Sequence, residues 1–181
     1  MSHFPVAVIH EEPEQLEMLL LPYMENCCAE PPREYMEFYE DEDCDVDPDT
    51  GKRGYWQNPN AKWDWWMLGG RWRGMLRATD GEYAPVPCYD SDGTRWSEPE
   101  PYPKGQYDVA RIGDLQWEQM ERIPYAAVTP DGKWHEVGKM LWFGHNTATS
   151  DEHAEWDAAF YERFIKPYPS HFWVAIVDCH I

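Results

Sequence analysis

The chain has 181 residues, with 34 acidic and 15 basic side chains and a formal net charge of −19. This charge disfavours direct binding to nucleic acids or anionic membranes, because their phosphates repel a carboxylate-rich surface. A hydrophobic content of 43% and an aromatic content of 15% argue against disorder. We therefore expect one domain over residues 1–181, with an acidic loop at 26–55 and an irregular insertion at 79–123.

The N-terminal residues predict a buried strand followed by a short helix. Phe4 to Ile9 is apolar and β-branched, which is typical of a strand. Pro13 suits the first turn of a helix, the leucines after it recur at helical spacing, and Pro22 ends the pattern.

The start of the chain and its cysteines favour a cytoplasmic location. No basic region precedes the first apolar run, so no secretory signal is expected, and no apolar stretch is long enough to span a bilayer. The five cysteines are odd in number and lack Cys-x-x-Cys spacing, which predicts free thiols rather than disulfides or a zinc site.

Residues 26–50 carry a high density of carboxylates and a single basic residue, Arg33. One interpretation is an acidic arm that faces a partner, and another is a solvated, mobile loop. A calcium site at Asp41–Gly51 is a weaker alternative, because the ligand spacing is irregular and Pro48 interrupts it. The candidate partner-binding residues are Glu37, Glu40, Asp41, Glu42, Asp43, Asp45 and Asp47.

The stretch Asn58–Gly74 holds four of the eleven tryptophans and a Gly-Gly pair. Gly69 and Gly70 permit a positive φ or a close backbone approach. From Arg71 to Ala78 the sequence alternates, which predicts a strand with Trp72 and Leu76 facing the core.

Two interpretations of this stretch stay open. The arginines on the opposite face, including Arg71 and Arg73, suit an anion-binding stripe, or they pair with the chain's own carboxylates. The tryptophans suit a stacking platform for bases or sugars, or they belong to the core. The candidate ligand-binding residues are Lys62, Trp63, Asp64, Arg71, Arg73 and Asp178.

The C-terminal half predicts a helix, a hairpin, a second helix and a final strand. Asp114 caps a predicted helix at 115–122, and a short strand is expected near 83–86. An Asp-Gly turn joins strands predicted at 125–129 and 134–137. Ser150 caps an amphipathic helix that ends before Pro167, and the apolar residues 172–179 form a central strand.

This order predicts an α+β ferredoxin-like β-α-β-β-α-β sandwich with an antiparallel sheet. In that topology the first and last strands are antiparallel neighbours, which brings His3 close to Asp178, Cys179 and His180. We regard His3, Asp178 and His180 as a candidate divalent-metal set or an acid–base group. Alternatively, they are polar strand ends, with Asp178 holding a backbone donor or an arginine such as Arg71.

Three motifs resemble those of an uncharacterised family of small proteins from bacteriophages and from bacterial genomes with prophages. They are MSHFPVAVI at the start, NPNAKWDWW with GGRW in the middle, and VDCHI at the end. The resemblance implies a phage setting, and it implies no chemistry.

Function is therefore a choice among classes. No P-loop, dinucleotide-binding or serine-nucleophile motif is present in the sequence, and no cofactor is indicated. We favour a phage-type acidic accessory protein that binds a host protein with a basic surface, as a defence inhibitor or DNA mimic. The alternatives are a small metal-dependent or nucleotide-handling enzyme, and a nucleotide-binding sponge that uses a Trp/Arg/His pocket. The sequence gives no oligomeric state.

Overall fold

The computed structural model of the chain describes residues 2–26, 31–82, 88–89, 95–97, 102–141 and 145–181. The helices and strands have the following bounds, in chain order: β1 (His3–His10), α1 (Gln15–Leu20), β2 (Glu37–Glu40), β3 (Gly54–Gln57), β4 (Trp65–Leu68), the 3-10 turn η3 (Gly70–Trp72), β5 (Leu76–Arg77), β6 (Cys88–Tyr89), β7 (Arg95–Ser97), β8 (Gln106–Tyr107), β9 (Val109–Arg111), β10 (Ala126–Val128), β11 (Trp134–Glu136), α2 (Ser150–Phe160) and β12 (Trp173–His180).

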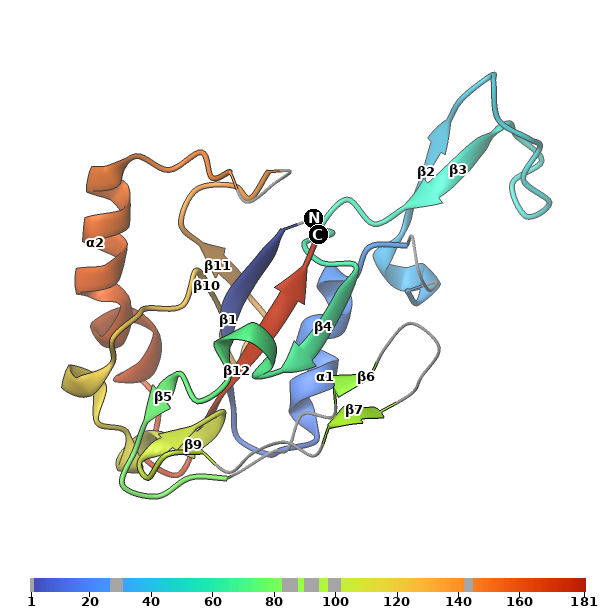
Figure 1. Cartoon of the computed structure of the whole chain (residues 1–181). Coiled ribbons are helices and arrows are strands. Elements are labelled where there is room, and N and C mark those ends of the chain that lie inside the picture. Colours follow the sequence, from blue (N-terminus) through green and yellow to red (C-terminus); the bar gives the residue numbers. More distant parts are fainter. Residues whose placement is uncertain (1, 27–30, 83–87, 90–94, 98–101, 142–144) are drawn as a thin grey trace.

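The first and last strands are antiparallel neighbours in the middle of the main sheet, as predicted. The register runs from His3 opposite His180 to His10 opposite Trp173. Ser2 and Ile181 exchange backbone hydrogen bonds of 2.9 and 3.0 Å, so the two termini lie side by side (Figure 1). Apart from their ends, both strands are buried, which explains their near-continuous apolar sequences.

The main sheet has the order β11-β10-β1-β12-β4, and β9 also pairs with β12. All of its pairings are antiparallel except that of β1 with β10, where Val6 to Val8 lie opposite Ala126 to Val128. The expectation of a wholly antiparallel sheet is therefore corrected to a mostly antiparallel one. The fold is mixed α/β with two α-helices among the described residues, and the specific ferredoxin-like topology is not confirmed.

The helical segments cover opposite faces of the sheet. Just after α1, the ring of Tyr23 lies 5.1 Å from that of Trp134 on β11. Beyond α2, the ring of Phe164 lies 5.0 Å from that of His135, the next residue along β11. Because successive side chains of a strand point to opposite faces, Tyr23 and Phe164 pack on different sides of the sheet.

The predicted N-cap of α2, Ser150, is instead the first residue of the helix. The N-cap is Thr149, not Ser150: the side chains of Thr149 and Glu152 each bond the other's backbone N–H, which forms a capping box. A π-helical turn, Tyr161–Ile165, continues α2 towards Pro167. Among the described residues, no helix has both the length and the apolar character to cross a membrane.

Two predicted elements are wrong. The alternating residues 71–78 do not form one strand, because η3 occupies 70–72 and β5 contains only Leu76 and Arg77. The segment 115–122 is not a helix and contains only the 3-10 turn Trp117–Gln119, whose tryptophan stacks on Phe160. The strand expected at 83–86 lies outside the described residues.

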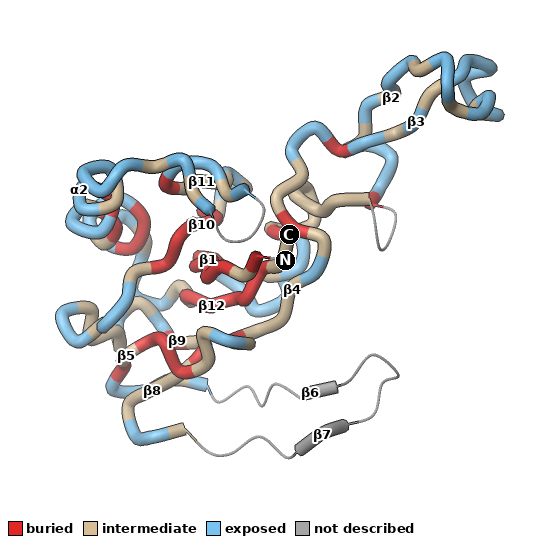
Figure 2. Tube along the Cα trace, turned by 45° about the horizontal axis from the view of Figure 1, so that its top comes forward, coloured by how far each residue is buried: buried red, intermediate tan, exposed pale blue. Residues whose placement is uncertain are grey.

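Residues 37–57 of the acidic segment form a hairpin rather than a loop without strands. Strands β2 and β3 pair with each other in a sheet of their own, from Glu37 opposite Gln57 to Glu40 opposite Gly54. This hairpin projects from the body, and exposed residues predominate along it (Figures 1 and 2). We call residues 33–57 the acidic arm.

Candidate functional site

The Gly-Gly turn of the central stretch leaves the main sheet where β4 ends. Its first glycine still bonds the sheet, because the Gly69 N–H donates to the Ile176 carbonyl at 2.8 Å. Gly69 and Gly70 then have φ of +69° and +51°, and η3 crosses in front of β12 (Figure 1). The positive φ expected at this pair is thus present, and it turns Arg71 to Arg73 out of the sheet.

Asp178 of β12 is the first carboxylate that holds this turn. Its Oδ1 lies 3.0 Å from His3 Nδ1, and its Oδ2 accepts a hydrogen bond of 2.9 Å from the Arg71 backbone N–H. The side chain is only 1% exposed, so both contacts form away from bulk water. Asp178 therefore ties the first strand to the arginine turn.

Asp108 is the second carboxylate, and it holds the other end of the turn. Its Oδ1 accepts from the Gly74 backbone N–H at 2.7 Å, and its Oδ2 accepts a short hydrogen bond from the Tyr102 hydroxyl. Burial raises the pKa of Asp108, although these donors and the charge of Arg73 act in the opposite direction. Burial and the Asp108 contact raise the pKa of Tyr102.

Two histidine–carboxylate pairs lie side by side at the chain ends. His180 Nδ1 is 2.6 Å from Asp64 Oδ1, and the rings of His3 and His180 are 4.8 Å apart. Trp65 lies edge-on to both imidazoles, with centroids 6.0 and 6.4 Å away. His3, Asp178 and His180 therefore lie close together, as predicted from the pairing of the first and last strands, and a carboxylate at Nδ1 is an arrangement that suits acid–base chemistry.

The metal interpretation receives no support from this geometry. Each imidazole directs Nδ1 to a different carboxylate, so the side chains do not converge on one point. No group of three or more His, Cys, Asp or Glu in the described part of the chain could hold a metal ion. Cys179 is fully buried, and burial raises its pKa well above the usual value, which suits an inert thiol.

The side chains of Lys62 and Trp63, both candidate ligand-binding residues, make their polar contacts outside this cluster. Lys62 Nζ forms an ion pair of 2.7 Å with Glu136. Trp63 belongs to the core, and its indole N–H donates to the Leu20 carbonyl at 3.1 Å. The core interpretation therefore describes Trp63, whereas Trp65 is 45% exposed.

Four arginines line one cavity of about 200 Å³ beside the turn. We define the arginine cavity by Arg71, Arg73, Arg77, Arg122, Trp72 and Glu121, which lie among its lining residues. Arg71, Arg73 and Arg77, which alternate along the sequence on one face of the predicted strand, thus line one cavity, even though that strand does not form. Arg122 was not predicted; it lies over the Trp72 ring at 5.8 Å.

The carboxylates of the acidic arm differ in their pairing. Arg33 pairs with Asp47 and Asp49, at 3.8 and 3.0 Å, and Lys52 pairs closely with Glu40. The Asp41 carboxylate accepts a hydrogen bond of 2.9 Å from the Asp43 backbone N–H. Within the described residues, no ion pair is made by the exposed side chains of Glu37, Glu42, Asp43 and Asp45.

Sequence reasoning missed several residues that shape these sites. Asp108 and Tyr102 lie in a segment expected to be irregular, and no local pattern distinguishes them from other surface residues. Tyr39 and Tyr55 were also missed, although each has an aromatic neighbour in the sequence, Phe38 and Trp56, and aromatic residues are enriched in strands.

The fold and the site define an α+β protein in which a buried aspartate pair fixes an arginine-bearing turn against the central strands. No family model, curated protein or solved structure matches the chain. The resemblance to the phage-associated family therefore rests on the three sequence motifs alone.

Proposed function

We propose that this chain is a phage-type accessory protein that binds a host protein in the cytoplasm through its acidic arm. The observation that carries the proposal is the projection of the β2–β3 hairpin from the body, with exposed residues predominating along it (Figure 2). The acidic residues Glu37, Glu42, Asp43 and Asp45 are among these exposed residues. We expect the partner to be a protein with a basic surface, because Glu37, Glu42, Asp43 and Asp45 form no ion pair within the described residues.

Two tyrosines give the arm an aromatic contact surface. Tyr39 and Tyr55 face each other across the hairpin, and their rings are stacked with centroids 5.8 Å apart. They are 38% and 45% exposed, whereas Arg33 covers the Trp56 ring on the other face at 3.4 Å. Tyrosine is enriched at interface hot spots, and a charged rim around an aromatic centre is typical of protein interfaces.

Basic proteins that bind nucleic acid are the partners that suit this arm best. Their grooves are built to accept a row of phosphates, and a row of carboxylates offers negative charges of the same sign. The arm would then occupy such a groove as a DNA mimic and inhibit the partner, for example a defence protein.

The test is affinity capture from a bacterial lysate at low salt with three baits. The first is the wild type, and the second carries the arm changes Glu37→Gln, Glu42→Gln, Asp43→Asn and Asp45→Asn. The third is a control that loses an equal number of negative charges on the body instead. In it, glutamine replaces the exposed residues Glu12, Glu14, Glu17 and Glu118. Captured proteins are identified by mass spectrometry and then tested as purified components.

We expect a basic partner on the wild-type and body-neutral baits, released by salt, and its loss from the arm-neutral bait. The purified partner should also bind more weakly to Tyr39→Ser and Tyr55→Ser, because both rings are exposed on the arm. Equal capture by all three baits, or a partner that ignores both tyrosines, would contradict the proposal.

An enzyme is the second candidate, and one observation favours it. The pairs His3–Asp178 and His180–Asp64 place two imidazoles side by side with carboxylates at Nδ1. However, neither histidine lines the arginine cavity. A turnover screen against nucleotides with added Mg²⁺, Mn²⁺ or Zn²⁺, repeated with His180→Gln, would test this candidate.

A further inference from the structure

The arginine cavity concentrates positive charge on a protein of opposite overall sign. It is lined by four arginines and one glutamate, so its lining side chains carry a net charge of +3, against −19 for the chain. In physiological salt, interactions between exposed charges fade over about 8 Å, whereas contacts inside a cavity are screened less. An anion in the cavity would therefore respond mainly to the guanidinium groups.

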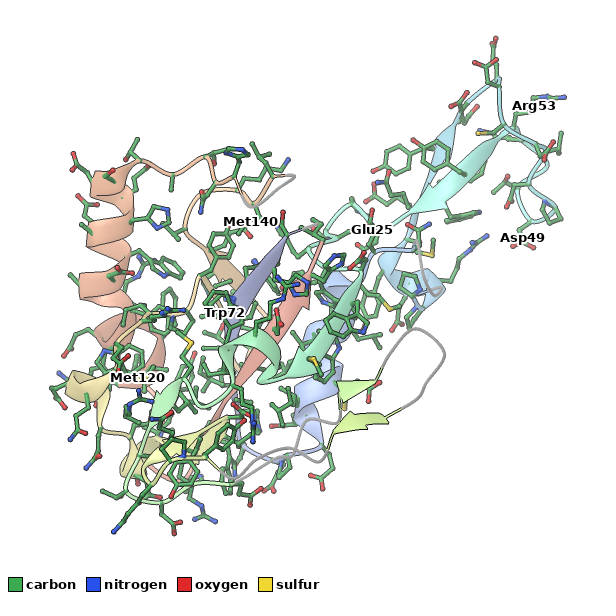
Figure 3. The ribbon with its side chains drawn as sticks, in the orientation of Figure 1. Glu25, Asp49, Arg53, Trp72, Met120 and Met140 are labelled. Atoms are coloured by element: carbon green, nitrogen blue, oxygen red, sulfur yellow. The ribbon has the colours of Figure 1, made fainter. Side chains whose placement is uncertain are left out.

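We propose that the arginine cavity binds the phosphate group of a small molecule, either free phosphate or a phosphate monoester. Guanidinium groups offer planar, bidentate hydrogen bonding that matches phosphate oxygens. This site does not depend on the acidic arm, which lies elsewhere on the molecule (Figure 3).

Two buried aspartates, Asp178 and Asp108, fix the backbone of the turn that carries Arg71 and Arg73. The Arg71 backbone bonds Asp178, and the Gly74 backbone bonds Asp108, at 2.9 and 2.7 Å. The Arg73 guanidinium lies 4.2 Å from the ring centre of Tyr102, whose hydroxyl bonds the buried Asp108. A site fixed in this way loses less conformational entropy when it binds an anion.

Two of the arginines are available for a ligand. The exposed side chains of Arg71 and Arg122 form no ion pair within the described part of the chain. Arg77 is paired with Glu121 at 3.0 Å, but Glu121 is 80% exposed, and exposed ion pairs contribute little. The indole nitrogen of Trp72 is buried and makes no hydrogen bond within the described residues.

The size of the cavity limits the ligand class. Its volume of about 200 Å³ is below the roughly 300–1,000 Å³ of pockets for drug-sized ligands. A phosphate on a short carbon skeleton therefore suits a cavity of about 200 Å³ better than a dinucleotide does. A nucleic-acid strand is disfavoured by the net charge of the chain.

The test uses the full chain and measures binding of inorganic phosphate and glycerol 3-phosphate by calorimetry at constant ionic strength. NMR chemical shifts of the backbone amides locate the bound ligand, and far-UV circular dichroism verifies the fold of each variant. The variants are Arg71→Gln and Arg122→Gln, whose side chains are exposed. The matched control is Arg163→Gln, an exposed arginine over Phe164 that removes the same charge outside the cavity.

We expect saturable binding, with amide shifts at residues 71–77, and affinity about tenfold weaker in each cavity variant. Arg163→Gln should bind within about twofold of the wild type, because remote exposed charges are screened. Tighter binding of glycerol 3-phosphate identifies a monoester and tighter binding of phosphate identifies the free ion, and both results support the site. Absence of saturable binding of either ligand, or a loss of affinity in Arg163→Gln equal to that in the cavity variants, would overturn it.

Discussion

A Cβ at position 70 would lie 2.4 Å from the Cβ of Asp178, so Gly70 and Asp178 are packed at a distance that only glycine permits. Gly70 also has a φ of +51°, which L-residues rarely adopt. We predict that Gly70→Ala lowers the free energy of unfolding by about 2–4 kcal/mol, since strain and a clash with a buried side chain add. Urea unfolding measures this loss.

Gly132 provides the matched control for that prediction. Its φ is +78°, but a Cβ there would meet nothing within 4 Å. Gly132→Ala should therefore cost only the backbone strain, about 1 kcal/mol. Equal losses at Gly70 and Gly132 would show that the contact with Asp178 contributes nothing.

Asp108 should make stability fall as the pH rises. Burial raises its pKa above the usual value of about 3.9, so the native state keeps the proton to higher pH than the unfolded chain does. Between those two pKa values the native state binds more protons, and deprotonation disfavours folding. We predict that the stability advantage of the wild type over Asp108→Asn shrinks from pH 4 to pH 7. Urea unfolding across this range tests the sign, and a growing advantage would contradict it.

Asp131 should show the opposite dependence. Hydrogen bonds from Lys133 and from the Thr129 hydroxyl lower its pKa to about 2. The contribution of Asp131 is then present above about pH 4 and is lost as the pH falls through about 2. Its side chain is 51% exposed, so we expect a contribution below about 1 kcal/mol. Acid unfolding curves of the wild type and Asp131→Asn should differ at pH 4 and converge near pH 2.

Strong local patterns predicted the frame of the fold. The Asp-Gly hairpin, the run of apolar residues in β12 and the capped helix α2 each have short-range signals, and all three were found. The neighbourhood of His3 and His180 followed from pairing the first and last strands, so part of the site was predictable as well.

The remaining differences come from long-range contacts. Residues 71–78 alternate as a strand would, but Asp178 and Asp108 capture the backbone of Arg71 and Gly74 and bend the segment into a turn. Neither aspartate is near the turn in sequence, so no local pattern could indicate this. A solvated, mobile loop was one interpretation of the acidic segment because of its charge, yet the cross-strand aromatic pairs Phe38–Trp56 and Tyr39–Tyr55 favour a hairpin there.

The tip of the acidic arm should be dispensable for the stability of the body. Among the described strands, β2 and β3 pair only with each other, and the arm is joined to the body near its base, where the Asn26 side chain donates to the Trp56 carbonyl at 2.7 Å. Figure 3 places Asp49 and Arg53 at the far end of the arm, away from Trp72 on the body.

Glu40 lies opposite Gly54, so an Asn-Gly turn can replace residues 41–53 and close the shortened hairpin. We predict that this replacement changes the free energy of unfolding by less than about 0.5 kcal/mol in urea, as surface changes usually do. It should nevertheless abolish partner capture, because Glu42, Asp43 and Asp45 are removed with the tip. A stability loss above about 2 kcal/mol would show that the tip supports the body, and retained capture would place the interface elsewhere.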